Sequence, residues 1–161
     1  MTQSTREQSA PSADKYVSKF EKFAKRTTGP AWLRAWREAG LARYGELGLP
    51  TTTHEDWRFT NVAPIARLPF RPAVEVPGEV TPEQLQRFTF ARQPGIKLVF
   101  VNGRFAANLS TPGPLPAGAR VDSLAAALAA DGELLQRQLG QYAQPVANGF
   151  AALNQAYFLD G

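Results

Sequence analysis

The sequence has no cysteine and a single histidine, His54. The absence of cysteine excludes disulfides, thiolate metal sites and a thiol nucleophile within this chain. The single histidine excludes every motif that needs two histidines from one chain. Positive charge is also modest, because the net charge is only +4 at pH 7, whereas a nucleic-acid-binding domain usually carries a denser basic stripe. Several common classes of site are therefore disfavoured.

Long apolar segments are missing as well. The chain has no apolar stretch of about 20 residues, the length that a membrane-spanning helix needs, and residues 1–8 lack the apolar core of a secretory signal. We therefore expect a cytoplasmic protein. Hydrophobic residues make up 43% of the 161 residues, which is ordinary for a globular chain. Residues 1–12 are predicted to be a disordered arm, and residues 13–161 a folded domain.

The segment 13–26 has the apolar spacing of a helix. Tyr16, Phe20 and Phe23 recur on one face. Basic side chains spread over the rest of its surface: Lys15, Lys19, Lys22, Lys25 and Arg26. We favour a core-facing aromatic stripe, because acidic residues dilute the positive charge. The alternative is a basic helix that binds nucleic acid or another anionic surface.

A second helix is predicted over residues 31–47. Pro30 is suited to the first turn of a helix, and Gly48 is suited to end one. One stripe of this helix is apolar: Trp32, Leu33, Trp36, Gly40, Tyr44 and Leu47. Two tryptophans on that stripe predict a large buried area.

The clearest β signal lies at residues 97–110. Asn102 and Gly103 form the favoured two-residue turn between two apolar runs, because both positions need positive φ. The second run is predicted as a strand from Arg104 to Leu109. The fold class is therefore α+β: a mostly helical domain with one β-hairpin.

Further helix starts follow from capping residues. Thr81, followed by Pro82 and Gln84, predicts a short helix over 82–88. Thr52 with Glu55, and Thr53 with Asp56, have the same spacing. Ser123, Asp131 and Asn148 are each predicted to begin a later helix.

No active site is predicted. His54, Glu55 and Asp56 contain the types needed for a base and its orienting group, but adjacent residues on a turn point apart. Other acidic residues are better explained as helix caps and first-turn acids: Asp122, Asp131 and Glu133. We expect no catalytic, cofactor-binding or metal-binding residue in this chain.

The segment LPTTTHEDWRFT, residues 49–60, resembles a signature of SufD-type iron–sulfur cluster assembly proteins. Three later segments resemble further elements of that family in the same order: 98–110, 121–124 and 150–161. The resemblance implies the family's N-terminal helical domain, without the right-handed β-helix that would follow it.

The resemblance also implies a function. SufD-type proteins belong to the SufB–SufC–SufD scaffold, which assembles iron–sulfur clusters with ATP hydrolysed by SufC. The chain is then expected to be a capping or protein–protein interaction module without catalysis of its own. SufB and SufC are its expected partners through the full-length subunit. The whole complex handles the cluster, and neither nucleic acid nor membrane is expected as a partner.

Trp57, Arg58 and Phe59 are the candidate docking residues, because exposed aromatics beside arginine make good interface anchors. The competing interpretation places Trp57 and Phe59 in the core. Self-association through the hairpin or the last helix is also expected, because a domain without its β-helix exposes apolar surface.

Overall fold

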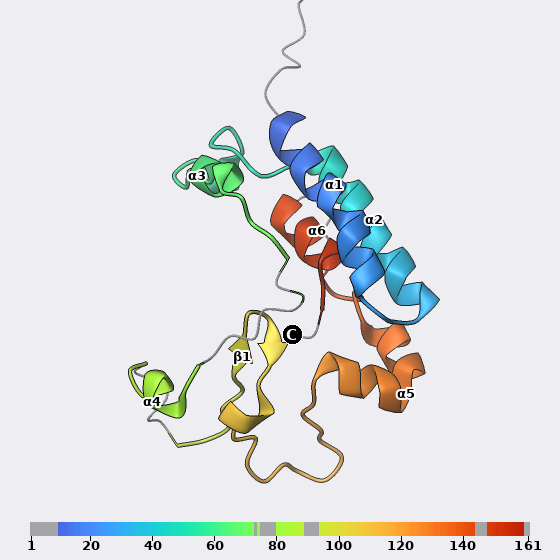
Figure 1. Cartoon of the computed structure of the whole chain (residues 1–161), viewed down its shortest axis with the longest axis vertical. Coiled ribbons are helices and arrows are strands. Elements are labelled where there is room, and N and C mark those ends of the chain that lie inside the picture. Colours follow the sequence, from blue (N-terminus) through green and yellow to red (C-terminus); the bar gives the residue numbers. More distant parts are fainter. Residues whose placement is uncertain (1–9, 73, 75–79, 89–93, 144–147, 160–161) are drawn as a thin grey trace, which may run out of the picture. The chain divides into compact units, whose positions relative to one another are not determined.

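The computed structural model describes residues 10–72, 74, 80–88, 94–143 and 148–159 (Figure 1). They fall into two compact units. The helical unit comprises Met1–Pro72 and Gln136–Phe158, and the hairpin unit comprises Ala73–Leu135 and Leu159–Gly161. Most of the predicted arm, residues 1–9, lies outside the described residues, so the arm and its boundary at residue 12 stay predictions.

Two long helices dominate the helical unit. Helix α1 spans Ala10–Arg26 and begins before the predicted start at residue 13. Its aromatic stripe is buried, since Tyr16 is 9% exposed and Phe20 and Phe23 are each 2% exposed. This confirms the core-facing interpretation of the stripe.

Helix α2 spans Ala31–Leu47, the predicted range, and Gly48 follows as its C-cap. Leu33, Gly40 and Tyr44 of the predicted stripe are buried. The two tryptophans of the stripe, Trp32 and Trp36, are only half-buried. The pattern therefore gave the boundaries and the central face of this helix.

Helix α6, Gly149–Ala156, lies against α2 in Figure 1. Gly40 allows this approach, because a Cβ at that position would lie 2.9 Å from the backbone nitrogen of Ala156. The amide Nε2 of Gln155 donates to the carbonyl oxygen of Trp36 at 2.7 Å. Asn148 caps α6 as predicted, since its Oδ1 accepts from the backbone N–H of Phe150 at 2.9 Å.

Aromatic rings fill the core of the helical unit. The rings of Tyr16 and Tyr44 meet edge to face, with centroids 5.8 Å apart, a favoured arrangement for aromatic pairs. Tyr157 packs against Phe23 with centroids 4.8 Å apart, and its hydroxyl donates to the carbonyl oxygen of Tyr16 at 2.5 Å. The last helix therefore closes the core that the first two begin.

The hairpin unit contains the predicted hairpin. Strands β1, Phe100–Val101, and β2, Arg104–Phe105, pair antiparallel. Asn102 and Gly103 have φ values of 52° and 77°, as the predicted turn requires. An outer bridge pairs Lys97 with Thr111. The α+β class with a hairpin near 97–110 is confirmed.

The returning strand is shorter than predicted. It ends at Phe105, and Ala107–Leu109 form a short 3-10 helix, η3. The hydroxyl of Ser110 helps to fix this turn, because it donates to the carbonyl oxygen of Ala106 at 2.8 Å and accepts from the N–H of Val99 at 2.9 Å. One backbone bond still joins the two runs here, from the N–H of Ala106 to the carbonyl oxygen of Val99 at 2.9 Å. The Ser110 hydroxyl takes the place of the ladder bond expected from the N–H of Val99.

Two further helices start at predicted caps. Helix α4, Pro82–Leu85, has the full capping box at Thr81, but it stops three residues before the predicted end at 88. Helix α5, Leu124–Gln138, has a non-helical residue, Asp131, at a kink. The Asp131 carboxylate accepts from the N–H of Leu134 at 3.0 Å, so the second predicted cap lies inside α5.

None of the described helices is both long and apolar enough to cross a membrane.

Candidate docking surface

The turn after α2 carries the three candidate docking residues. It contains a short 3-10 helix, η1, Glu55–Trp57, and then α3, Ala63–Arg67. The capping boxes predicted at Thr52 and Thr53 are wrong, since His54 is the N-cap of η1 and no side chain caps it. Instead, the N–H of Thr51 donates to Nδ1 of His54 at 3.1 Å. The histidine thus holds the turn.

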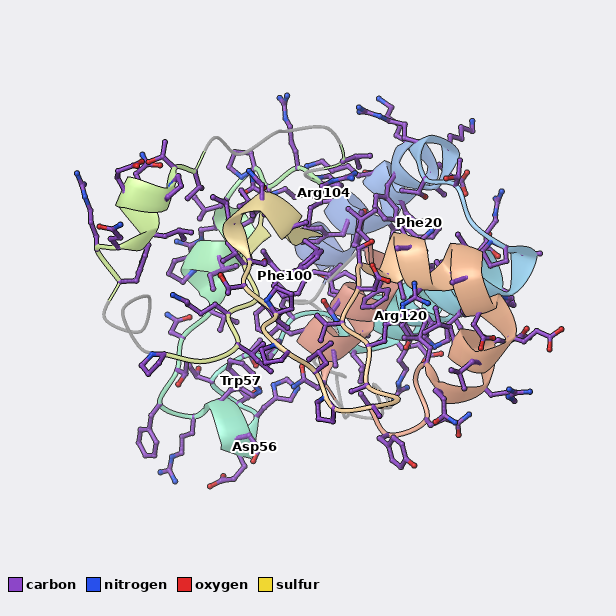
Figure 2. All side chains as sticks on the ribbon, turned by 90° about the horizontal axis from the view of Figure 1, so that it is seen from below. Phe20, Asp56, Trp57, Phe100, Arg104 and Arg120 are labelled. Atoms are coloured by element: carbon purple, nitrogen blue, oxygen red, sulfur yellow. The ribbon has the colours of Figure 1, made fainter. Side chains whose placement is uncertain are left out.

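Trp57 fixes the turn to the core of the helical unit. Its ring lies against Phe150 of α6 with centroids 5.4 Å apart. It packs as a partly buried side chain on the cluster that contains Tyr44 and Leu49. In Figure 2, Trp57 lies on the inner side of the turn, whereas Asp56 points away from the ribbon. Trp57 therefore has a structural contact of its own.

Phe59 is placed very differently from Trp57. Its side chain is 93% exposed. The guanidinium carbon of Arg58 lies 5.4 Å from the centroid of the Phe59 ring, within the range of a cation–π contact. The structure thus separates the three candidates: Trp57 contacts the core, and Arg58 with Phe59 forms an exposed pair.

Other apolar side chains are exposed around α3. Ile65, Leu68 and Phe70 are 41%, 50% and 48% exposed. The carbonyl oxygens of Leu68 and Phe70 accept hydrogen bonds from Lys15 and Lys19 of α1. These bonds hold the chain after α3 beside α1, and they occupy two of the lysines on the predicted basic face.

No group of three or more histidine, aspartate or glutamate side chains among the described residues could hold a metal ion. The backbone carbonyl of Thr51 and its N–H both lie at the His54 ring nitrogen Nδ1. This ring nitrogen is therefore engaged by the histidine's own turn.

The sequence reasoning missed one residue of α2. Arg37 is 5% exposed; its Nε donates to the carbonyl oxygen of Phe158 at 2.9 Å and its Nη1 donates to the Thr27 hydroxyl at 3.3 Å. Burial lowers the pKa of this guanidinium. The signal was its spacing, because Arg37 lies four residues after Leu33 and three before Gly40, on the buried stripe.

Comparison with known proteins identifies the class of this chain. Residues 10–161 match the family described as the SufBD protein N-terminal region, and the chain belongs to that family. Over 63 residues it is 35% identical to the iron-sulfur cluster assembly protein SufD of Escherichia coli (strain K12). This stretch covers 39% of the chain and 14% of the SufD protein. The resemblance to SufD-type N-terminal regions is confirmed. No solved structure matches the chain.

Proposed function

We propose that this chain takes part in iron–sulfur cluster assembly as a protein-interaction or capping module without catalysis of its own. Two findings support the proposal: membership of the SufBD N-terminal family, and the similarity to a protein named for iron–sulfur cluster assembly. SufB and SufC are the proposed partners, reached through the full-length subunit, and the cluster is cargo of the whole complex.

The observation that carries the docking role is the exposure of Phe59. An aromatic ring that is 93% exposed leaves a large apolar area in water, and covering it on binding is favourable. The turn that presents the ring is preformed, because Trp57 is seated against Phe150. A preformed anchor loses little conformational freedom when a partner binds. Arg58 and Phe59 are therefore the proposed contact residues, with Trp57 as their support.

The capping role is supported by the hairpin unit. Ile96, Leu98 and Phe100 alternate along one run of the hairpin and are 56%, 43% and 48% exposed. Alternate residues of a strand point to the same face. An apolar sheet face of this kind is suited to cover the end of a β-helix, as terminal caps do in solenoids. The same face is the proposed site of self-association.

Co-purification tests the docking role. The tagged chain is expected to retain SufB or SufC from the same source, and Phe59→Ala is expected to weaken that retention about tenfold, as for a typical interface anchor. Phe88→Ala is the matched control, because Phe88 is an exposed phenylalanine of the hairpin unit at 67%. Equal retention by Phe59→Ala and unchanged chain would refute docking through this residue.

Trp57→Ala tests whether Trp57 stabilises the turn or contacts the partner directly. Its circular dichroism melting curve is expected to shift to lower temperature, because the ring packs on the core. A variant with unchanged melting but lost partner binding would instead place Trp57 in the interface.

The alternative function, a basic helix for nucleic acid or an anionic surface, has less support. Lys15 and Lys19 donate to the carbonyls of Leu68 and Phe70, so these two ammonium groups are held on the protein's own backbone rather than directed at a phosphate. Binding to nucleic acid that weakens steeply with rising salt would favour this alternative over the docking role.

A further inference from the structure

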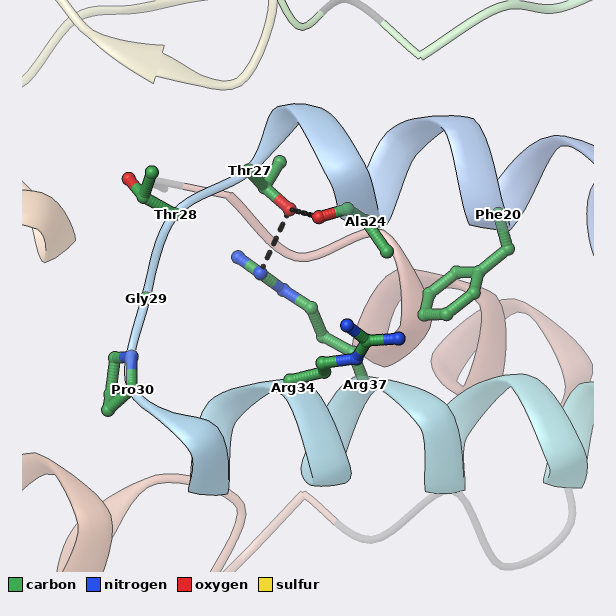
Figure 3. A pocket seen from close by; sticks show the side chains of 8 residues that line it. All are labelled: Phe20, Ala24, Thr27, Thr28, Gly29, Pro30, Arg34 and Arg37. Carbon is green, nitrogen blue, oxygen red and sulfur yellow. Dashed lines mark hydrogen bonds between the residues drawn. The ribbon is translucent and has the colours of Figure 1, made fainter.

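A hollow of about 300 Å³ lies at the turn between α1 and α2 (Figure 3). Thr27, Thr28, Arg34 and Arg37 are among its lining residues. Figure 3 shows both arginine side chains reaching from α2 into the space below α1. The hollow belongs entirely to the helical unit and lies on elements that the docking turn does not use.

The buried guanidinium of Arg37 lacks a negative partner within the described part of the chain. Its hydrogen bonds go to the carbonyl of Phe158 and the hydroxyl of Thr27, and its face covers the Phe23 ring with 5.5 Å from Cζ to the ring centroid. The ion pairs among the described residues join carboxylates to other arginines: Arg34, Arg43 and Arg120. A buried charge without a counter-charge is costly, so this position favours an anion.

Two other features of the hollow also carry positive charge: Arg34 and the start of α2. Arg34 donates through Nε to Glu38 at 2.8 Å, and its terminal nitrogens are the donors that a ligand would use. Helix α2 begins at the hollow. Its N-cap residue is Pro30, and no side chain makes a capping hydrogen bond to the first turn. The start of a helix carries partial positive charge and N–H groups directed outward. Two guanidinium groups and a helix start therefore face one space, and Glu38 and Glu21 are the carboxylates whose charge acts on Arg34.

We propose that this hollow binds a small free phosphate species, inorganic phosphate or a phosphate monoester, between Arg37, Arg34 and the start of α2. A guanidinium fork matches two phosphate oxygens at once. A phosphate monoester carries about 1.5 to 2 negative charges at neutral pH. Two arginines can balance that charge more fully than they could use the single charge of a carboxylate. The bound phosphate supplies the counter-charge for Arg37.

The test is a titration of the full chain with inorganic phosphate, with sodium chloride at equal ionic strength as the reference. Amide resonances of residues 27–29 and 31–34 are expected to shift saturably with phosphate and not with chloride. Arg34→Gln is expected to raise the Kd about tenfold, the scale of one charged hydrogen bond. Glu38→Gln is expected to lower the Kd, because the competing carboxylate is removed.

Arg43→Gln is the matched control. Arg43 also pairs with a glutamate on α2, Glu46, at 2.5 Å, but it does not line the hollow. The Kd is expected to be unchanged in this variant. Arg37→Gln is avoided as the main test, because losing its bonds to Phe158 and Thr27 is expected to impair folding.

Three results would overturn the proposal. The first is an equal response to phosphate and chloride. The second is an equal loss of binding in Arg34→Gln and Arg43→Gln, which would indicate general charge rather than a site. The third is phosphate binding by Asp160→Asn but not by the unchanged chain. Asp160 follows Phe158 by two residues, and that result would assign the counter-charge to the chain itself.

Discussion

The helical unit and the hairpin unit differ in how much apolar surface they bury. Among the described residues, nine of the ten buried hydrophobic side chains belong to the helical unit, and Val74 alone belongs to the hairpin unit. The hairpin unit instead leaves Phe88, Ile96, Leu98 and Phe100 exposed. The helical unit thus has a core of its own.

The difference has a physical origin in the elements themselves. Helices of 17 residues, such as α1 and α2, present continuous apolar stripes that can cover one another. A hairpin whose strands have two residues each offers little area, and an isolated hairpin is marginal in water. Stability is therefore expected to come from the helical unit. The exposed run from Ile96 to Phe100 in the hairpin unit is expected to gain apolar burial only when another surface covers it.

The largest expected change in stability comes from removing an aromatic ring from the core of the helical unit. Tyr44 is fully buried at 0% exposure, whereas Tyr142 is 95% exposed. Tyr44→Ala is expected to lower the free energy of unfolding by about 3–5 kcal/mol, through lost burial and the remaining cavity. Tyr142→Ala is expected to change it by less than about 0.5 kcal/mol. Urea unfolding followed by circular dichroism measures both, and similar values would contradict the assigned core.

Overpacking tests the contact between α2 and α6. A Cβ at Gly40 would lie 2.9 Å from the Ala156 nitrogen, whereas one at Gly45 would meet nothing within 4 Å. Gly40→Ala is expected to destabilise the fold by about 1–3 kcal/mol. Gly45→Ala, on the same helix, is expected to be neutral or to stabilise by up to about 1 kcal/mol. Urea unfolding measures both variants. A midpoint for Gly40→Ala that is not lower than that for Gly45→Ala would contradict the close contact between α2 and α6.

Alkaline pH acts on the helical unit, which contains all four tyrosines of the chain. Burial, with smaller contributions from Tyr16 and Tyr44, raises the pKa of Tyr157 to about 12. The unfolded chain loses this proton near pH 10 and the folded chain does not, so stability falls as pH rises from 10 to 12. We expect a loss of about 1–2 kcal/mol, because Tyr157 is only half-buried.

Tyr157→Phe provides the control for this pH effect. Its stability is expected to depend less on pH between 10 and 12, because the phenylalanine has no proton to lose. If the unchanged chain and Tyr157→Phe lose the same stability over this range, another group is responsible.

The smallest expected effect compares one helix cap in each unit. Asn148→Ala removes the cap of α6 and is expected to lower the free energy of unfolding by about 1 kcal/mol. Thr81→Ala removes the capping box of the four-residue helix α4 and is expected to leave global unfolding nearly unchanged. Faster hydrogen exchange at Gln84 alone would show that the second loss is local.

Local signals in the sequence predicted much of this fold. The limits of α2, the turn at Asn102 and the caps at Thr81, Ser123, Asp131 and Asn148 depend on neighbouring residues only, and they are confirmed. The start of α1 and the end of α4 differ by a few residues, because helix ends respond weakly to sequence.

Long-range features were out of reach. The burial of Arg37 depends on Phe158, which lies 121 residues away along the chain. Trp57 and Phe59 differ in burial because Phe150 of α6 packs against the ring of Trp57, whereas the ring of Phe59 is exposed. A spacing pattern ranks faces of a helix, but it does not say which distant side chain covers a turn.

The hydrogen bond from Tyr157 to the Tyr16 carbonyl joins residues that are 141 positions apart. During synthesis, α1 and α2 leave the ribosome long before α6 does. Their aromatic faces therefore stay uncovered until nearly all of these residues have been made, and the loop closed by this contact is long. An early stop in translation would release a helix pair with an open apolar face, which is a natural substrate for chaperones.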